Sequence, residues 1–228
     1  MKLSIHQPAY LPWLGLFHRI LKSDTYVFMD TVQFEKNSYT NRNKILTANG
    51  ETWLTIPVTQ KGHMTQTLQD TLINNQAPWK KKHLKSIYFS YKKASHFDDA
   101  YPKLEALYAK DHDKLSDFCF DHLLFWLDQF NIETSIIRLS GNPVEGSKND
   151  LLINICSQYN AQYYIPGGLG QDYLDNDLFS DNNIQVELQN FTHPVYTQIH
   201  GNFVPNMGIV DYWMNCGNDL KSLLMDQL

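Results

Sequence analysis

The 228-residue sequence is poor in cysteine, with only Cys119, Cys156 and Cys216, and these three lie far apart. No Cys-x-x-Cys pair is present, so neither a disulfide framework nor a zinc knuckle is expected. No His-x-His pair and no clustered Asp/Glu pair has the spacing of metal ligands, and we predict no metal site. This cysteine usage fits the reducing cytoplasm best.

The sequence also lacks a long apolar run and an excess of positive charge. No stretch approaches the eighteen or more apolar residues of a membrane span, and the N-terminal apolar run is too short for a signal peptide. Lys and Arg number 19 against 24 Asp and Glu, a net charge of −5 that argues against DNA as a partner. Hydrophobic residues make up 43% of the chain, enough to bury a full core.

The order of apolar and polar residues predicts an α/β fold. A short strand at 3–7, a helix at 13–22 and a buried strand at 25–29 together have the size of a βαβ unit. Apolar residues then recur at helical spacing over a long segment. We predict one α/β domain over residues 1–228, with a mainly parallel, Rossmann-like sheet and a helical insert at about residues 78–130.

Further elements are predicted on both sides of this insert. Asn49-Gly50 supplies two residues that adopt positive φ easily, which predicts a hairpin. The remaining patterns predict strands at 68–73, 134–139, 162–165 and 184–188, and helices at 148–158 and from about residue 209 onward.

Three polar clusters follow predicted strands: His6 with Gln7, Asp30, and Gly167-Gly168. Ligands of open α/β sheets bind beyond the carboxyl ends of the strands, so these clusters are expected to share one pocket. His6 is a candidate general acid or base, because the ordinary pKa of histidine lies near neutrality. A structural alternative remains for each side chain, since His6 can cap a strand end and Asp30 can anchor a loop.

Two segments have the composition of a phosphate site. Asn41, Arg42 and Lys44 combine amide and cationic donors, although a solvated flank of the hairpin would look the same. The backbone amides of Gly167-Gly168 could approach a pyrophosphate. The glycine pattern alone is a weak signal, because it matches neither G-x-G-x-x-G nor the Walker pattern.

The C-terminal part alternates aromatic and polar residues around His193, Tyr196 and Gln198. This composition suits stacking on a base or sugar ring, and it also suits a packed loop. A nucleophile motif of the G-x-S-x-G type is absent. The lysine run 80–82 is most simply a solvated helix face and gives only weak support for an RNA partner.

Taken in order along the chain, several blocks resemble the WbqC-like protein family, and they cover nearly the whole sequence. The blocks are residues 5–15, 23–34, 41–43, 53–58, 164–168, 173–174 and 193–196. Proteins of this family tend to be encoded among surface-polysaccharide genes. The resemblance implies acyl or aminoacyl transfer, plausibly glycyl transfer, to the amine of a nucleotide-linked amino sugar in O-antigen synthesis.

Under this hypothesis the sites follow from the motif positions and from our own chemical reasoning. The candidate catalytic residues are His6, Asp30 and His193. The candidate substrate-binding residues are Gln7, Tyr10, Trp13, Asn41, Arg42, Lys44, Gly167, Gly168, Tyr173, Tyr196 and Gln198. The activated acyl donor stays open between an aminoacyl-tRNA, a thioester, and ATP with a free acid.

Two alternatives remain open. The first is a non-catalytic protein that binds a nucleotide sugar in the same pocket. The second is an ATP-dependent amide-forming ligase, because the turn and helix around Trp13 are similar to those of nucleotidylyltransferases, a superfamily that includes pantothenate synthetase. Trp13 and Leu16 stand where that superfamily carries the two histidines of His-x-Gly-His, so the donors that stabilise a transferring phosphate are missing.

Overall fold

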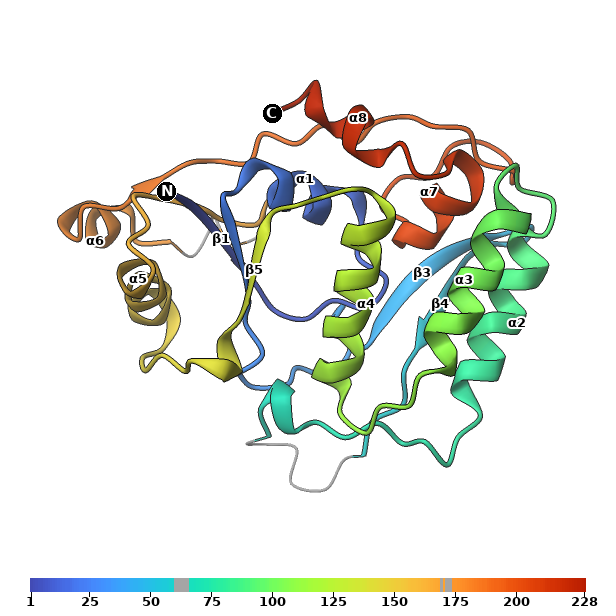
Figure 1. Ribbon diagram of the computed structural model, residues 1–228, viewed down its shortest axis with the longest axis horizontal. Helices are drawn as coiled ribbons and strands as arrows, with labels where there is room; N and C mark the ends of the chain where they lie inside the picture. The colour runs from blue at the N-terminus through green and yellow to red at the C-terminus, as the bar shows by residue number, and fades with distance from the viewer. Residues whose placement is uncertain (60–65, 169, 171–173) are drawn as a thin grey trace.

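The computed structural model describes residues 1–59, 66–168, 170 and 174–228 (Figure 1). The strands are β1 (Lys2–His6), β2 (Thr25–Phe28), β3 (Arg42–Thr47), β4 (Gly50–Thr55), β5 (Ser135–Arg138), β6 (Tyr163–Ile165) and β7 (Gln185–Val186). The helices are α1 (Leu14–Lys22), α2 (Trp79–Tyr91), α3 (Phe97–Ala109), α4 (Leu115–Gln129), α5 (Lys148–Gln158), α6 (Asn176–Asp181), α7 (Ile209–Cys216) and α8 (Leu220–Met225).

β1 lies at the centre of a five-stranded sheet of order β5-β2-β1-β6-β7. It pairs with β2 on one edge and with β6 on the other, and every pairing in this sheet is parallel. Along the chain the sheet first grows outward through β2 and β5, then returns to β6 on the other side of β1. This is the 3-2-1-4-5 order of a doubly wound sheet, so the predicted parallel, Rossmann-like α/β fold is confirmed.

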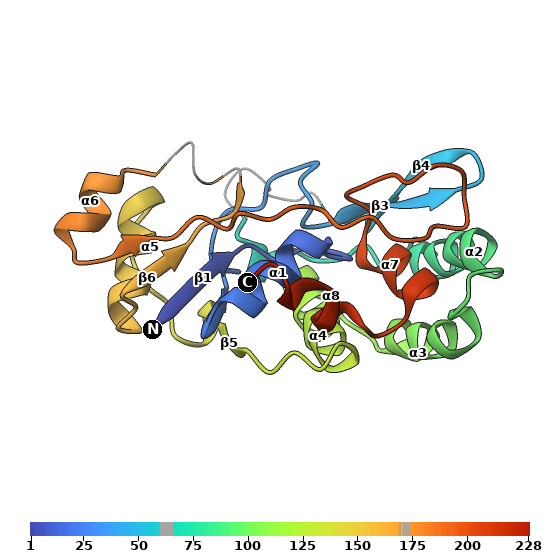
Figure 2. The ribbon, with the colours of Figure 1, turned by 90° about the horizontal axis from the view of Figure 1, so that it is seen from above.

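Side chains alternate between the two faces of the sheet, and each face is covered by helices. Leu3 and Ile5 of β1 belong to a buried cluster that includes residues of α5 and α6, such as Phe179. Tyr26 of β2 points to the opposite face, into a larger cluster with Phe17 of α1 and with α4. Figures 1 and 2 show α5 and α6 at one end of the molecule and α4 beside α1.

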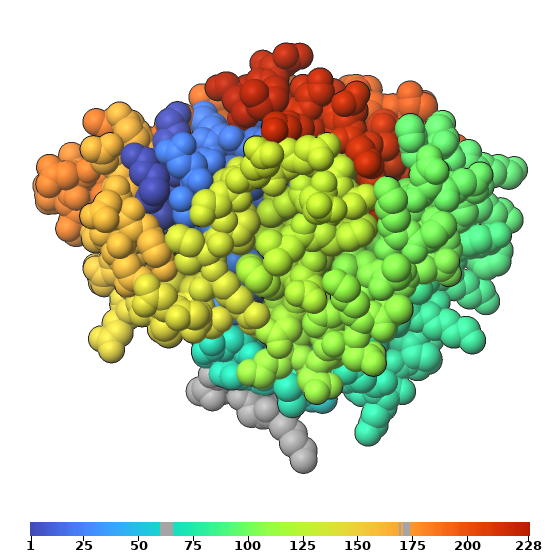
Figure 3. Space-filling view, viewed as in Figure 1, coloured from blue at the N-terminus to red at the C-terminus, as the bar shows by residue number. Residues whose placement is uncertain are grey.

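Between β2 and β5 the chain forms the predicted hairpin and the predicted helical insert. β3 and β4 pair antiparallel, and Gly50 has a positive φ of 96° at the turn. α2, α3 and α4 occupy residues 79–129, close to the predicted limits of 78–130. On the face seen in Figure 3, α4 and the segment that follows it form the middle of the surface.

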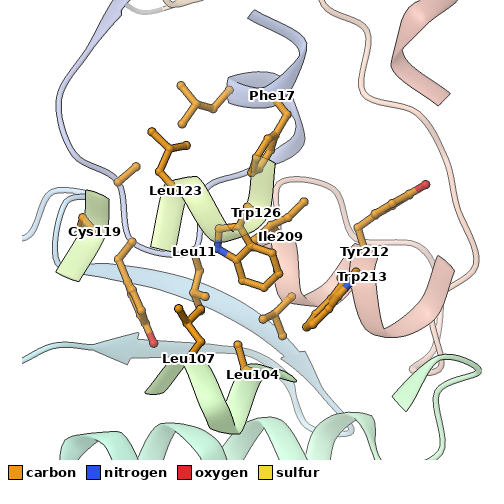
Figure 4. Packing of buried hydrophobic residues seen from close by; sticks show 14 of the residues in the cluster. Leu11, Phe17, Leu104, Leu107, Cys119, Leu123, Trp126, Ile209, Tyr212 and Trp213 are labelled. Carbon is orange, nitrogen blue, oxygen red and sulfur yellow. The ribbon is translucent and has the colours of Figure 1, made fainter. Parts of the chain in front are cut away.

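One aromatic core joins the insert to α1 and to the C-terminal helices. Trp126 of α4 meets Trp213 of α7 edge-to-face, with ring centroids 5.1 Å apart (Figure 4). The ring of Phe17 of α1 meets the ring of Phe130 edge-to-face, with the centroids 5.6 Å apart. Leu104 of α3 completes this group, and all of these side chains are nearly or fully buried. The packing continues from α1 through α4 to α3 and α7, while the single-domain organisation stays a prediction.

The strand predicted at 68–73 is wrong. Leu68–Asp70 is a 3₁₀ helix, and only isolated bridges flank it. The backbone amides of Leu68 and Gln69 donate to the carbonyls of Val32 and Asp30, at 2.8 Å each. The segment therefore hydrogen-bonds to the loop after β2 instead of forming a strand ladder, and a six-residue stretch of mixed apolar and polar residues could not reveal this tertiary preference.

A long segment between β7 and α7, residues 187–208, crosses the molecule and is tied to a buried carboxylate. Figure 2 shows it running from the α6 end to the α7 end. Asp211 of α7 is fully buried and accepts hydrogen bonds from Tyr91 (2.8 Å), Tyr196 (2.7 Å) and Gln198 (2.7 Å). This carboxylate links the crossing segment to α2 and α7.

Replacing this anchor is expected to destabilise the fold. Asp211→Ala removes the acceptor of three buried donors, and we expect a loss of roughly 2–4 kcal/mol in the free energy of unfolding. Urea denaturation followed by circular dichroism measures it. Asp219→Ala, a change at the first residue before α8, is the control and should shift stability by less than about 0.5 kcal/mol. An unchanged midpoint for Asp211→Ala would contradict the anchoring role.

Candidate functional site

A cavity of about 700 Å³ opens at the carboxyl ends of the central strands. Its walls include Ile5, His6 and Gln7 at the end of β1, together with Gly167 and Gly168 after β6. The order of the sheet reverses between these two strands, and ligands of doubly wound sheets bind at that switch point. The structure therefore brings together two of the three predicted strand-end clusters.

His6 is the imidazole of this cavity. Its Nδ1 lies 2.7 Å from the carbonyl oxygen of Gln7, which can only accept, so Nδ1 carries the proton and Nε2 is left as an acceptor. Burial, reinforced by the positive charge of Arg19, lowers the pKa of His6 to about 3, although the bond to Gln7 acts in the opposite direction. At neutral pH the side chain is uncharged and can accept a proton or a hydrogen bond.

Trp13 and Tyr39 form an aromatic wall beside His6. The Trp13 ring meets the His6 ring edge-on at 5.6 Å and lies 5.5 Å from Tyr39, and both aromatic residues line the cavity. Tyr39 is 44% exposed, so this wall continues to the surface. Rings of this kind can stack on a nucleobase or on the apolar face of a sugar.

The loop between β1 and α1 that carries Gln7 and Trp13 is held in a strained form. Leu11 has a φ of 44°, a left-handed conformation that bulky residues rarely adopt. Its carbonyl accepts a 2.6 Å hydrogen bond from Asn43, which is fully buried in β3, and Pro12 accepts one from α7. Neighbouring elements thus fix the loop, and a rigid loop positions the side chains at its ends.

Arg19 is a cavity residue that sequence reasoning missed. It lies on α1 with only 2% of its surface exposed, and it lines the cavity together with Gly15 and Leu16. The available signal was its position: helical spacing places Arg19 beside Leu16 and Ile20, on the side of α1 that faces the core. The sequence pattern of this helix could therefore have identified Arg19 as a cation on its apolar side.

Asp30 follows β2, but its carboxylate faces β5 and is absent from the cavity walls. It accepts from Arg138 Nε at 2.7 Å and from the backbone amide and hydroxyl of Ser140 at 3.0 and 2.9 Å. Its neighbour Met29 lines the cavity instead. This arrangement corresponds to the loop-anchor alternative, because every hydrogen bond of the buried carboxylate is made to structural partners.

Tyr10 is in the core and does not line the cavity. Its side chain is fully buried, and its hydroxyl hydrogen-bonds to the Tyr108 hydroxyl and, at 2.8 Å, to Nδ1 of His83. Burial raises its pKa well above the ordinary value, and the neighbouring Tyr108 hydroxyl acts in the same direction. The side chain joins the start of the loop to the helical insert.

The three candidates of the hairpin also lie outside the cavity walls. Asn41 donates a 2.9 Å hydrogen bond to a backbone carbonyl across the hairpin. The Arg42 guanidinium stacks over Trp53, 4.4 Å from the ring centroid, and Lys44 forms a 2.7 Å ion pair with Glu51. These side chains contact other residues of the hairpin region, and Asn41 is buried and not solvated as the alternative of a hairpin flank expected.

The C-terminal candidates are occupied by partners in the crossing segment. His193 donates from Nδ1 to the carbonyl of the next residue at 2.9 Å, and its Nε2 accepts from the Asn206 amide at 3.2 Å. Both nitrogens are therefore used, and the cavity wall here is Asn206. Tyr196 and Gln198 donate to the buried carboxylate of α7. Tyr173 lies outside the described residues.

The role of Asp30 can be tested by stability. Asp30→Ala leaves Arg138 and Ser140 without their buried acceptor, and we expect the free energy of unfolding to fall by about 2 kcal/mol. Asp117→Ala is the matched control: Asp117 pairs with the same guanidinium but its side chain is 43% exposed. We expect it to cost less than about 1 kcal/mol in urea denaturation. Normal stability of Asp30→Ala would exclude the anchoring role.

The protonation state of His6 gives a further prediction. Because burial and Arg19 lower its pKa to about 3, we expect the folded protein to keep His6 neutral, with the proton on Nδ1, at pH 5. The unfolded chain protonates it near the ordinary value of about 6.5, so His6 reduces stability as the pH falls below that value. Nitrogen-15 NMR of the imidazoles, assigned with His6→Gln, measures this. Half-protonation above pH 6 would contradict it.

Two negative findings apply to the part of the chain that the structure describes. No group of three or more His, Cys, Asp or Glu side chains there is arranged to hold a metal ion. No helix among these residues is both long enough and apolar enough to cross a membrane.

Comparisons with known proteins extend to almost the whole chain. A protein of Mycobacterium tuberculosis (strain ATCC 25618 / H37Rv), named Uncharacterized protein Rv1507c, is 30% identical over 225 residues, which cover 98% of this chain and 97% of the relative. No solved structure gives a significant match. The model of the WbqC-like protein family matches residues 7–222, a range that includes the loop after β1 and the glycines after β6. The chain belongs to the WbqC-like protein family.

Proposed function

We propose that this protein transfers an acyl or aminoacyl group, glycyl in the simplest case, to the amine of a nucleotide-linked amino sugar. The observation that supports this most is the position of the cavity at the switch point of a doubly wound sheet, where such folds bind nucleotides. We place the reaction in the cytoplasm, as a step of surface-polysaccharide (O-antigen) synthesis. The substrate would enter beside the Trp13–Tyr39 wall, which suits a base or sugar ring.

The chemistry needs a neutral amine and an activated carbonyl. The amine nitrogen attacks the acyl carbon, a carbon–nitrogen bond forms, and the bond from the acyl carbon to the donor's leaving group breaks. The proton lost by the amine goes to Nε2 of His6, which is free to accept it, and passes from there to the leaving group. The amide of Gln7 lies in the same wall and would orient the substrate or the oxyanion.

The donor is an aminoacyl-tRNA, a thioester, or ATP with a free acid, and each supplies a leaving group for this step. The adenylate-forming ligase is the least supported of these possibilities. Trp13 and Leu16 line the cavity at the positions where nucleotidylyltransferases carry imidazoles, and neither supplies a donor that matches an imidazolium. Transfer from a donor that is already activated needs no such groups.

One observation favours a second candidate, a protein that binds a nucleotide sugar without transforming it. A histidine with a pKa of about 3 is a weak base at neutral pH, because general bases work best with a pKa near the operating pH. The binding alternative uses the same cavity and differs only in the absence of proton transfer.

The proposed reaction is tested by product analysis. The protein is incubated with thymidine- and uridine-linked amino sugars, glycine or other acyl groups, and each donor, and mass spectrometry detects the sugar carrying the added acyl group. His6→Ala is expected to lower the rate by about 10²-fold or more while binding of the nucleotide sugar stays within a few-fold. His96→Ala is the matched control. His96 is exposed and directly precedes α3, so this change should leave the rate unchanged.

The outcomes separate the two candidates. An adduct that depends on His6 supports the transferase. Calorimetric binding of the nucleotide sugar without an adduct from any donor contradicts the transferase and supports the binding protein. Absence of both binding and adduct contradicts both candidates.

A further inference from the structure

The buried guanidinium of Arg19 has no role in the proton transfer described above, and its surroundings are unusual for a buried charge. Arg19 is 2% exposed and lines the cavity from α1. Its Nε and Nη1 have no hydrogen-bond partner among residues 1–59, 66–168, 170 and 174–228, and no carboxylate in those ranges forms an ion pair with it. Buried charges are normally paired, and leaving one unpaired costs several kcal/mol.

The groups around Arg19 do not replace a counterion. The titratable side chains that interact electrostatically with Arg19 are Tyr26, Tyr164 and His6. Burial raises the pKa of both tyrosine hydroxyls, although Arg19 itself acts against this, so they are neutral at physiological pH, as is His6. Arginine remains protonated in proteins. The cavity therefore contains a fixed positive charge with no negative group among the described residues that line it.

The backbone after β6 is shaped around this charge. A Cβ atom on Gly167 would lie 2.5 Å from Nη1 of Arg19, so any larger residue would force the guanidinium out of its present position. Gly168 also lines the cavity, and no described atom lies within 4 Å of the position that its Cβ atom would occupy. Glycines that let a ligand approach the backbone are a recurring feature of phosphate sites.

We infer that Arg19, with the backbone at Gly167 and Gly168, forms a binding site for the diphosphate of a nucleotide. The site deepens the proposed function and rests on it for the nucleotide, whereas the fit to an oxyanion follows from a guanidinium that has no counterion among the described residues. Arginine matches the geometry of phosphate oxygens with two parallel N–H donors, one from Nη2 and the other from Nε or Nη1, and neither Nε nor Nη1 of Arg19 has a partner among the described residues. This places the phosphates between α1 and β6, with His6 at the same wall.

The test uses the full chain and inorganic pyrophosphate as the probe, with binding measured by isothermal titration calorimetry. Arg19→Met keeps much of the side-chain volume and removes the charge, and we expect affinity to fall roughly tenfold or more. Arg19→Lys keeps the charge without the forked donors and should lie between wild type and Arg19→Met. Gly167→Ala keeps Arg19 but displaces its guanidinium, and it should also weaken binding.

Lys22→Met is the matched control for Arg19→Met. It removes a cation from the same helix, but the Lys22 ammonium pairs with Glu187 at 3.1 Å and is absent from the cavity walls. Its affinity for pyrophosphate should equal that of wild type. A stability measurement accompanies each variant: the folding midpoint of Arg19→Met should be unchanged or higher, because the variant removes an unpaired buried charge.

The inference falls if wild type does not bind pyrophosphate, if Arg19→Met and Arg19→Lys bind it as wild type does, or if glycine or acetate competes with it equally well. The last result would assign the guanidinium to a carboxylate. A marked loss of stability in Arg19→Met with normal binding in Gly167→Ala would also overturn it, by showing a structural cation. Failure of the acyl-transfer assay leaves pyrophosphate binding unaffected, so the two proposals can fail separately.

Discussion

The central position of β1 in a sheet that extends to both sides is the constraint on which the rest of the molecule depends. Its backbone pairs with β2 and with β6, so both edges of the strand are satisfied and its end is held in place. After β1 the chain turns toward α1, and after the neighbouring strand β6 it turns in the opposite direction, toward α6. The space between the two departures becomes the cavity, and the side chains that end β1, begin α1 and follow β6 become its walls.

Two buried carboxylates fix the segments around this centre. Asp30 holds the end of β5 through Arg138 and Ser140, and Asp211 holds the crossing segment through its three donors. A buried carboxylate is tolerated only when donors surround it, so such residues bring together segments that are distant in sequence. Because buried carboxylates need donors, several of the predicted site residues, such as Tyr196 and Gln198, bind structural partners and do not face the cavity.

The sequence was sufficient for the fold class and for most of the elements, because periodicity indicates which residues are buried. Thr25–Phe28 is buried throughout, as its continuous apolar run indicated, and the helical spacing of residues 78–130 corresponds to three helices. The site was harder, because being near the end of a strand does not determine where a side chain points. His6 and Gln7 face the cavity, whereas Asp30 points toward β5 and Tyr10 into the core. The directions of Asp30 and Tyr10 depend on contacts across more than 70 residues of sequence, which spacing cannot encode.

Arg19 and His6 differ in their hydrogen bonding from Asp30 and His193, although buried polar atoms without partners also occur in the core, as at His122. Both oxygens of Asp30 and both ring nitrogens of His193 have partners, while Nε and Nη1 of Arg19 and Nε2 of His6 have none within the described part of the chain. Arg19 and His6 are also coupled, because the positive charge of one lowers the pKa of the other. Under the proposed function, an anionic ligand beside Arg19 would offset that charge and raise the pKa of His6, while burial, the larger cause of its low pKa, would remain. The basicity that matters for catalysis is therefore the one in the presence of the phosphates.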